Sequence, residues 1–298
     1  MALMRSALPI LASLMAALVL GVAPAPAQES LSTETHETSA RPDIEKLIKD
    51  SGADVSIAFR SLDGGQELLI HPDRPFRDSV AMKLPVMIEL FAQAQARQLR
   101  LTDTIRVRDL FRSVVDGSAY AVEPASGDTL THDAGKWMTL RDLCEVMITR
   151  DSDIAANLLI ERLSLQSIQG RIHSLGADGM VLASYFGDAK AAEKGIRDAT
   201  TPRALMTILL ALAHNQVVDA DASREMIGIL SRSRLPGSIA YSPASAARVH
   251  TPTGDVHDAD IVFGARSFVL VVDVRGLTDP QATAALVGQI AHLLAAAI

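Results

Sequence analysis

The sequence predicts a mixed α/β protein of the α+β class, with one antiparallel sheet assembled from both ends of the chain. Strand-like runs occur near the N-terminus and near the C-terminus, and each is accompanied by a helical pattern. The long stretch between them carries mainly helical patterns. This order favours a sheet flanked by the terminal helices, plus an inserted all-α lobe. We expect a functional site in the crevice between the two lobes.

The N-terminal part of this sheet is predicted from a helix followed by a hairpin. In residues 41–52, Pro42 suits the first turn of a helix and Gly52 suits its end. Residues 53–72 then alternate apolar and polar side chains on both sides of Asp63-Gly64-Gly65. That alternation around a short glycine turn is typical of a β-hairpin.

The C-terminal part mirrors this arrangement. Residues 258–276 contain two strand-like runs around a turn at 264–267. A final helix follows, with Thr278 or Asp279 as its cap and Pro280 in its first turn.

The inserted lobe is predicted from apolar residues at helical spacing. The expected helices cover residues 84–98, 139–150, 152–163, 164–175, 201–214 and 222–233. We place the α/β lobe at about residues 41–80 and 228–298, and the helical lobe at about 81–227.

The first 27 residues are typical of a secretory signal peptide. Arg5 precedes an apolar run, Leu8–Val22, and the small residues Ala25-Pro26-Ala27 follow it. The run is short and is broken by Pro9, which argues against a membrane span. No cysteine for lipid attachment follows the run. We therefore expect a mature domain of residues 28–298, exported across the inner membrane to the periplasm or beyond, with no membrane anchor.

Composition excludes several classes of function. The 28 basic and 35 acidic residues give a formal charge of −7 and are spread along the chain, so neither a nucleic-acid groove nor a surface for anionic lipid is predicted. Cys144 is the only cysteine, so an intrachain disulfide is impossible and stability must come from the core. We expect Cys144 to be a buried small hydrophobe and Trp137 to pack beside a helix start.

The stretch FRDSVAMKLPVMIELF, residues 76–91, carries a serine and a lysine one helical turn apart. Lys83 is four residues after Ser79 and three after Val80. Burial lowers the pKa of an amine until it accepts a hydroxyl proton, so Ser79 and Lys83 form a chemically sensible nucleophile–base pair. The other interpretation is that Asp78 or Ser79 caps the helix, with Pro85 in its first turn, while Lys83 is solvated or ion-paired.

Three further stretches, residues 147–163, 198–212 and 248–264, complete a pattern that extends from about Asp54 to the C-terminus. In order and spacing, the chain resembles the class A β-lactamase and penicillin-binding serine hydrolase superfamily, whose motifs are S-x-x-K, S-D-N and K-T-G. The resemblance implies a β-lactamase/transpeptidase-like fold.

The same resemblance implies that the catalytic motifs are degenerate. Val80 occupies the position of the nucleophile, and an alkyl side chain cannot attack a carbonyl; the motif lysine remains as Lys83. In the second motif, Asp151, Ser152 and Asp153 put two carboxylates where the family has a proton-relay hydroxyl and a positioning amide. These charges would repel the carboxylate that the family's substrates carry.

The third motif and the deacylating glutamate are also altered. Pro252, Thr253 and Gly254 replace K-T-G, and proline supplies neither charge nor N–H. The position of the glutamate aligns with Gly187, and Asp188 and Glu193 are the candidate substitutes.

Two interpretations follow from these residues. In the first, the protein is an exported, degenerate family member that has lost acyl-serine chemistry and binds a β-lactam, a peptidoglycan-related ligand or a protein partner, or has no current ligand. In the second, it is an active serine hydrolase of the β-lactamase or esterase/amidase type that uses Ser79 with Lys83.

A third hypothesis is metal or carboxylate chemistry by acidic and imidazole groups. The residues concerned are Asp151, Asp153, His257, Asp258 and Asp260. Their spacings have low specificity, and such residues at helix starts and strand entries usually serve as caps and turns. The sequence predicts no cofactor and no metal site.

Overall fold

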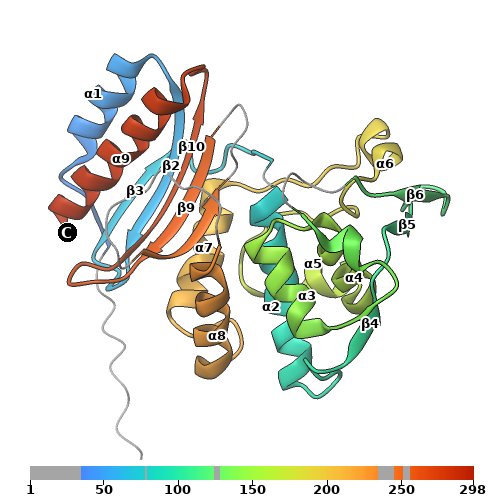
Figure 1. The fold of residues 1–298 in the computed structure, drawn as a ribbon. Helices are drawn as coiled ribbons and strands as arrows, with labels where there is room; N and C mark the ends of the chain where they lie inside the picture. The colour runs from blue at the N-terminus through green and yellow to red at the C-terminus, as the bar shows by residue number, and fades with distance from the viewer. Residues whose placement is uncertain (1–34, 78, 124–127, 234–244, 251–255) are drawn as a thin grey trace, which may run out of the picture. The chain divides into compact units, whose positions relative to one another are not determined.

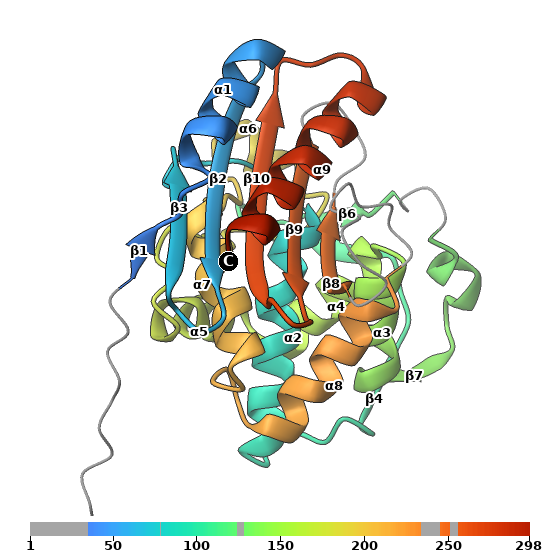
Figure 2. The same ribbon diagram turned by 90° about the vertical axis from the view of Figure 1, so that its left-hand side faces the viewer.

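A six-stranded sheet organises the protein, in the strand order β1-β3-β2-β10-β9-β8 (Figures 1 and 2). The computed structural model describes residues 35–77, 79–123, 128–233, 245–250 and 256–298. The strands are β1 (His36–Glu37), β2 (Asp54–Ser61), β3 (Gln66–Ile70), β8 (Ser245–His250), β9 (Val256–Val262) and β10 (Phe268–Arg275). The central pairs join β2 and β3, from one end of the chain, to β9 and β10 from the other, as predicted.

The strand pairing of the sheet agrees with the hairpins predicted from the sequence. β2 and β3 form the expected hairpin around Gly64, whose φ of 76° lies in the left-handed region that favours glycine. β10 pairs antiparallel with both β2 and β9. The sheet is not wholly antiparallel, because β1 adds to β3 in parallel orientation. No sequence pattern predicted β1, since two residues are too few to show alternation.

Alternating residues of β10 separate two apolar clusters. Phe268, Leu270, Val272 and Val274 belong to the cluster under α1 (Arg41–Ser51) and α9 (Pro280–Ala297), which lie side by side across one face of the sheet (Figure 2). Val269 and Val271 belong to the larger cluster on the opposite face, built with the remaining helices. The period of two along the strand thus makes the sheet the boundary between the clusters.

The middle of the chain is mainly helical, as expected. Its helices are α2 (Ser79–Gln95), α3 (Leu140–Thr149), α4 (Asp153–Leu163), α5 (Leu165–Ser174), α6 (Ala189–Glu193), α7 (Pro202–Ala213) and α8 (Ala220–Ser231), with a 3-10 helix, η1 (Leu130–Asp133). Helices α3, α4, α5 and α7 begin at serine or threonine caps whose hydroxyl oxygen accepts a backbone N–H. α7 contacts β10, β2 and β9, so it covers the sheet on the side opposite α9 (Figure 1).

Two short sheets interrupt the predicted all-α segment. β4 (Thr104–Arg106) pairs with β7 (Trp137–Thr139), and β5 (Leu110–Arg112) pairs with β6 (Ala119–Ala121). Each strand has three residues, too few for a period-2 signal in the sequence.

Three single-residue expectations have different outcomes. Cys144 is fully buried, and burial raises the pKa of its thiol, as expected for a small hydrophobe. Trp137 does not pack as expected but is 67% exposed, because it lies on a short surface strand. Pro85 lies inside α2 rather than in its first turn, so the helix has one N–H donor fewer there. Within the part of the chain described, no helix combines the length and apolarity needed to cross a bilayer.

Candidate functional site

Lys83 is the centre of the candidate site and is completely buried. It lies in the second turn of α2, between the apolar residues Met82 and Leu84, which face the larger apolar cluster. A charged ammonium buried in such a setting must be paired, because its desolvation is otherwise very costly. The residues that pair with it come from the segment leading into α4.

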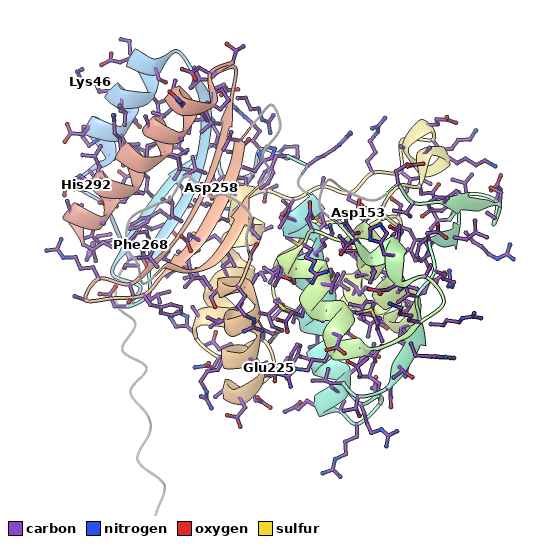
Figure 3. All side chains as sticks on the ribbon, viewed as in Figure 1. Lys46, Asp153, Glu225, Asp258, Phe268 and His292 are labelled. Carbon is purple, nitrogen blue, oxygen red and sulfur yellow. The ribbon has the colours of Figure 1, made fainter. Side chains whose placement is uncertain are left out.

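Asp151 and Asp153 supply the pairing charges. The Nζ of Lys83 donates to the backbone carbonyl of Asp151 at 2.9 Å and to the Oδ1 of the same residue. Asp153 Oδ1 lies 2.6 Å from Nζ and forms an ion pair. Figure 3 shows Asp153 at the start of α4, beside the upper end of α2. One cation is thus held between two anions.

The backbone places both carboxylates on the lysine. Asp151 has a φ of 55°, a left-handed conformation that aspartate tolerates better than most residues. Ser152 follows as the N-cap of α4, with its Oγ accepting the N–H of Ala155 at 3.2 Å. This cap starts the helix at Asp153, so a single turn of chain brings both carboxylates to Nζ.

The Ser152 hydroxyl makes two structural hydrogen bonds, one as acceptor and one as donor. Besides capping α4, it donates to Asp128 Oδ2 at 2.6 Å, and Asp128 in turn accepts the N–H of Leu130 at 2.9 Å. Ser152 is fully buried and Asp128 is nearly so. Nothing in the sequence indicated Asp128, because the contact spans 24 residues and aspartate is common in loops.

Phe186 is the aromatic residue that covers the lysine. Its ring centroid lies 5.1 Å from Nζ, close enough for a cation–π contact. The backbone of Phe186 is fixed by the buried Asn157, whose Nδ2 donates to the Phe186 carbonyl at 2.9 Å and whose Oδ1 accepts the Phe186 N–H at 2.8 Å. Neither residue was expected at the site from the sequence, since nothing local in either segment indicates a contact across 29 positions.

The two candidate nucleophile positions lie at the start of the same helix. α2 begins at Ser79, so Ser79 is the first helical residue rather than the expected cap. Residue 78, the other candidate cap, lies outside the described residues. Val80, three residues before Lys83, is 4% exposed and belongs to the larger apolar cluster. At Val80 the site presents an alkyl group.

The substitutes considered for the deacylating glutamate have other roles. Asp188 is the N-cap of α6, accepting the N–H of Ala191 at 3.1 Å and that of Val114 at 2.9 Å. Glu193 is the last residue of α6 and is exposed. The residue that contacts Lys83 from this loop is Phe186, one position before Gly187, and it has no titratable group.

Pro252, Thr253 and Gly254 lie outside the described residues, and β8 ends just before them at His250. Their predicted place beside the site therefore stays a prediction.

The residues of the metal hypothesis are not brought together. Asp258 and Asp260 pair across β9–β10 with Val272 and Leu270, which belong to the cluster under α9. His257 lies on the other face, stacked on Phe76 with ring centroids 4.6 Å apart and its Nδ1 2.8 Å from Asp273 Oδ1.

Figure 3 shows Asp258 on the sheet and Asp153 at the start of α4, away from it. Among the residues that the structure describes, no group of three acidic, histidine or cysteine side chains is placed to hold a metal ion.

The hydrogen-bonding capacity of Lys83 limits what it can do chemically. An ammonium has three donors and no acceptor, and its nitrogen here faces three oxygens: the Asp151 carbonyl, Asp151 Oδ1 and Asp153 Oδ1. A general base would need a lone pair directed at a nucleophile. The arrangement instead matches an ammonium held as a structural cation.

Comparison with known proteins identifies the family to which this site belongs. A sequence profile described as the Beta-lactamase enzyme family matches residues 39–298. The chain belongs to the beta-lactamase enzyme family. No curated protein matches at a significant level.

Solved structures of this family share the fold. The beta-lactamase of Sphaerobacter thermophilus DSM 20745 is 22% identical, with a TM-score of 0.70 over 86% of this chain and 95% of that chain. The ancestral GNCA class A beta-lactamase is 22% identical, with a TM-score of 0.72 over 87% of this chain and 100% of that chain.

A PBP-A variant, solved as an acyl-enzyme complex with penicillin G, is 20% identical, with a TM-score of 0.72 over 87% and 95%. The fold predicted from the sequence, β-lactamase/transpeptidase-like, is therefore confirmed.

Proposed function

We propose that this protein is a non-acylating member of the beta-lactamase family that binds a cell-wall-related ligand, either a β-lactam or a peptidoglycan fragment. The observation that carries the proposal is the pairing of the buried Lys83 ammonium with Asp151 and Asp153. Acyl transfer to a serine requires a hydroxyl and a base that accepts its proton. The hydroxyl is missing because Val80 occupies the nucleophile position. The base is missing because the N–H donors of Lys83 face oxygens and leave no lone pair for a hydroxyl proton.

The charge of the site also bears on the ligand. Lys83, Asp151 and Asp153 together carry one positive and two negative formal charges, and Phe186 covers the lysine. A carboxylate brought close to this group meets repulsion that is weakly screened because the site is partly buried. We therefore propose that a ligand keeps its own carboxylate away from Asp151 and Asp153.

We further propose that residues 1–27 direct export and are removed, so that the protein works in the periplasm or outside the cell. The support is the charged start, the short apolar run and the small residues at 25–27. N-terminal sequencing of the protein recovered from a periplasmic fraction tests this: a start at Gln28 supports the proposal, and an intact Met1 contradicts it.

Turnover of a chromogenic cephalosporin tests the loss of acyl-serine chemistry against the alternative in which Ser79 is the nucleophile. We expect the wild-type protein and Ser79→Ala to give the same absorbance trace as buffer. Turnover that disappears in Ser79→Ala would establish the alternative, a serine hydrolase that uses Ser79 with Lys83. Ser231→Ala, an exposed hydroxyl at the end of α8, is the matched control variant.

A further inference from the structure

A pocket of about 460 Å³ lies next to the candidate site but does not include its ion pair. Its wall is formed by residues 184–189 and 196–198, together with Ala192 of α6, Met82 of α2 and Arg77. Met82 precedes Lys83, and Phe186 both lines the pocket and covers the Lys83 ammonium. The volume falls within the roughly 300–1,000 Å³ of small-molecule sites.

Most of the lining is apolar. Met82, Phe186 and Ile196 contribute aliphatic and aromatic surface, and Tyr185 adds a second ring. Such walls favour a ligand with an apolar body, because each Å² of apolar surface removed from water contributes about 25 cal/mol. The polar groups of the pocket then determine the orientation of the bound ligand.

Two arginine side chains supply hydrogen-bond donors to the pocket. Among the described residues, neither Arg77 nor Arg197 makes a hydrogen bond or an ion pair, and each guanidinium carries five N–H donors. Each of the two carboxylates of the wall accepts two backbone N–H groups. Asp188 accepts the N–H groups of Ala191 and Val114, and Asp198 Oδ1 accepts those of Ala183 at 2.7 Å and Ser184 at 3.1 Å.

The surroundings of Asp198 also shift the pKa of its carboxyl. Burial raises the pKa of this carboxyl, and the two backbone N–H groups and Arg77 offset that rise only in part. The pocket therefore combines apolar walls, two acidic groups held by backbone donors and two guanidinium groups open to a ligand.

We propose that this pocket binds a small organic carboxylate with an apolar body, whose carboxylate is held by Arg77 and Arg197 and whose body contacts Met82, Phe186 and Ile196. Arginine is the side chain best suited to this task, because its planar fork matches the two oxygens of a carboxylate. Neither Val80 nor Lys83 is among the residues that line this pocket, so this proposal does not depend on the proposed loss of acyl-serine chemistry.

Isothermal titration calorimetry with 4-phenylbutyrate and with its neutral counterpart, 4-phenylbutanamide, tests the proposal. We expect one saturable site for the carboxylate and at least about tenfold weaker binding of the amide, since the amide cannot form charge-assisted hydrogen bonds with guanidinium. Equal affinities, or no saturable binding of the carboxylate, would overturn it.

Variants then locate the binding. Arg77→Gln/Arg197→Gln should weaken carboxylate binding at least about tenfold while leaving the weaker amide binding unchanged. Ala192→Trp should abolish binding of both probes by filling the pocket with both arginines retained.

Arg162→Gln/Arg224→Gln removes two exposed arginines elsewhere and should bind like the wild type. Unchanged carboxylate affinity in the Arg77/Arg197 variant or in Ala192→Trp would place the site elsewhere and refute the proposal.

Discussion

At the scale of single residues, the buried ammonium of Lys83 depends on two carboxylates that are themselves partly exposed. The exposed side-chain fractions are 0% for Lys83, 21% for Asp151 and 26% for Asp153. The two carboxylates are therefore partly accessible to solvent, whereas the cation and the Asp153 Oδ1 that faces it are buried. The two carboxylates offset the free-energy cost of burying the cation.

Asp151→Asn/Asp153→Asn should lower the free energy of unfolding by about 3–5 kcal/mol, because it leaves the Lys83 ammonium buried without an anion. Asparagine suits position 151, since it tolerates positive φ as aspartate does, so the variant isolates the charge. Urea denaturation at pH 7 measures the effect.

The control is Asp178→Asn/Asp221→Asn, because the side chains of Asp178 and Asp221 are 69% and 91% exposed. This double substitution should lower the free energy of unfolding by less than about 1 kcal/mol. A loss no larger in the Asp151/Asp153 variant than in this control would show that the ion pair does not stabilise the fold.

Asp198 gives a prediction about pH. Burial raises the pKa of Asp198 in the native state above its ordinary value of 3.8, which applies to the unfolded state. At a pH between the unfolded-state pKa and the native-state pKa, the native state therefore binds more protons than the unfolded state. This group therefore makes the protein less stable as pH rises through that interval. Asp198→Asn keeps an oxygen for the N–H groups of Ala183 and Ser184 and removes the charge.

The stability of Asp198→Asn relative to wild type should thus increase from about pH 4 upward and then level off. Urea denaturation across pH 4–8 measures it, with Asp178→Asn as the exposed control. A relative stability that decreases with rising pH would mean that the native fold favours the charged form of Asp198, contrary to the expectation.

At the scale of elements, the sequence predicted most of the helices because they carry local signals, but it did not predict the short helix α6. The caps Ser152, Ser164, Thr201 and Asp279 start α4, α5, α7 and α9 where the pattern placed them. The short strands of the middle segment, β1 and β8 were not predicted, since pairing over a few residues is decided by tertiary contacts rather than by propensity.

Ser152→Ala tests the cap that places Asp151 and Asp153. Ser152 is fully buried, accepts the Ala155 N–H and donates to Asp128. Loss of both bonds should lower the free energy of unfolding by about 1–3 kcal/mol. Ser231→Ala, exposed in α8, should change it by less than about 0.5 kcal/mol. Equal effects of the two substitutions would show that the cap contributes nothing beyond a surface hydroxyl.

At the scale of the whole molecule, the sheet joins strands from both ends of the chain, and the candidate site joins α2 to the segment before α4. The sequence predicted this fold and the positions of Val80, Lys83, Asp151 and Asp153, because motif spacing carries that information. It did not predict that the two aspartates would pair with Lys83, nor that Phe186 would cover it. Those contacts span 68 positions or more and depend on how α2, α4 and the segment that contains Phe186 pack together.

The central claim is that Lys83 is a paired structural cation and that this family member does not form an acyl-enzyme. Intact-mass spectrometry of the wild-type protein and of Val80→Ser after incubation with penicillin G tests it most directly. We predict that both masses stay unmodified, because a serine restored at position 80 still faces a lysine held by Asp151 and Asp153. An adduct of one penicillin on the wild type would refute the loss of the nucleophile, and rapid acylation of Val80→Ser alone would show that Lys83 remains free to act as the base.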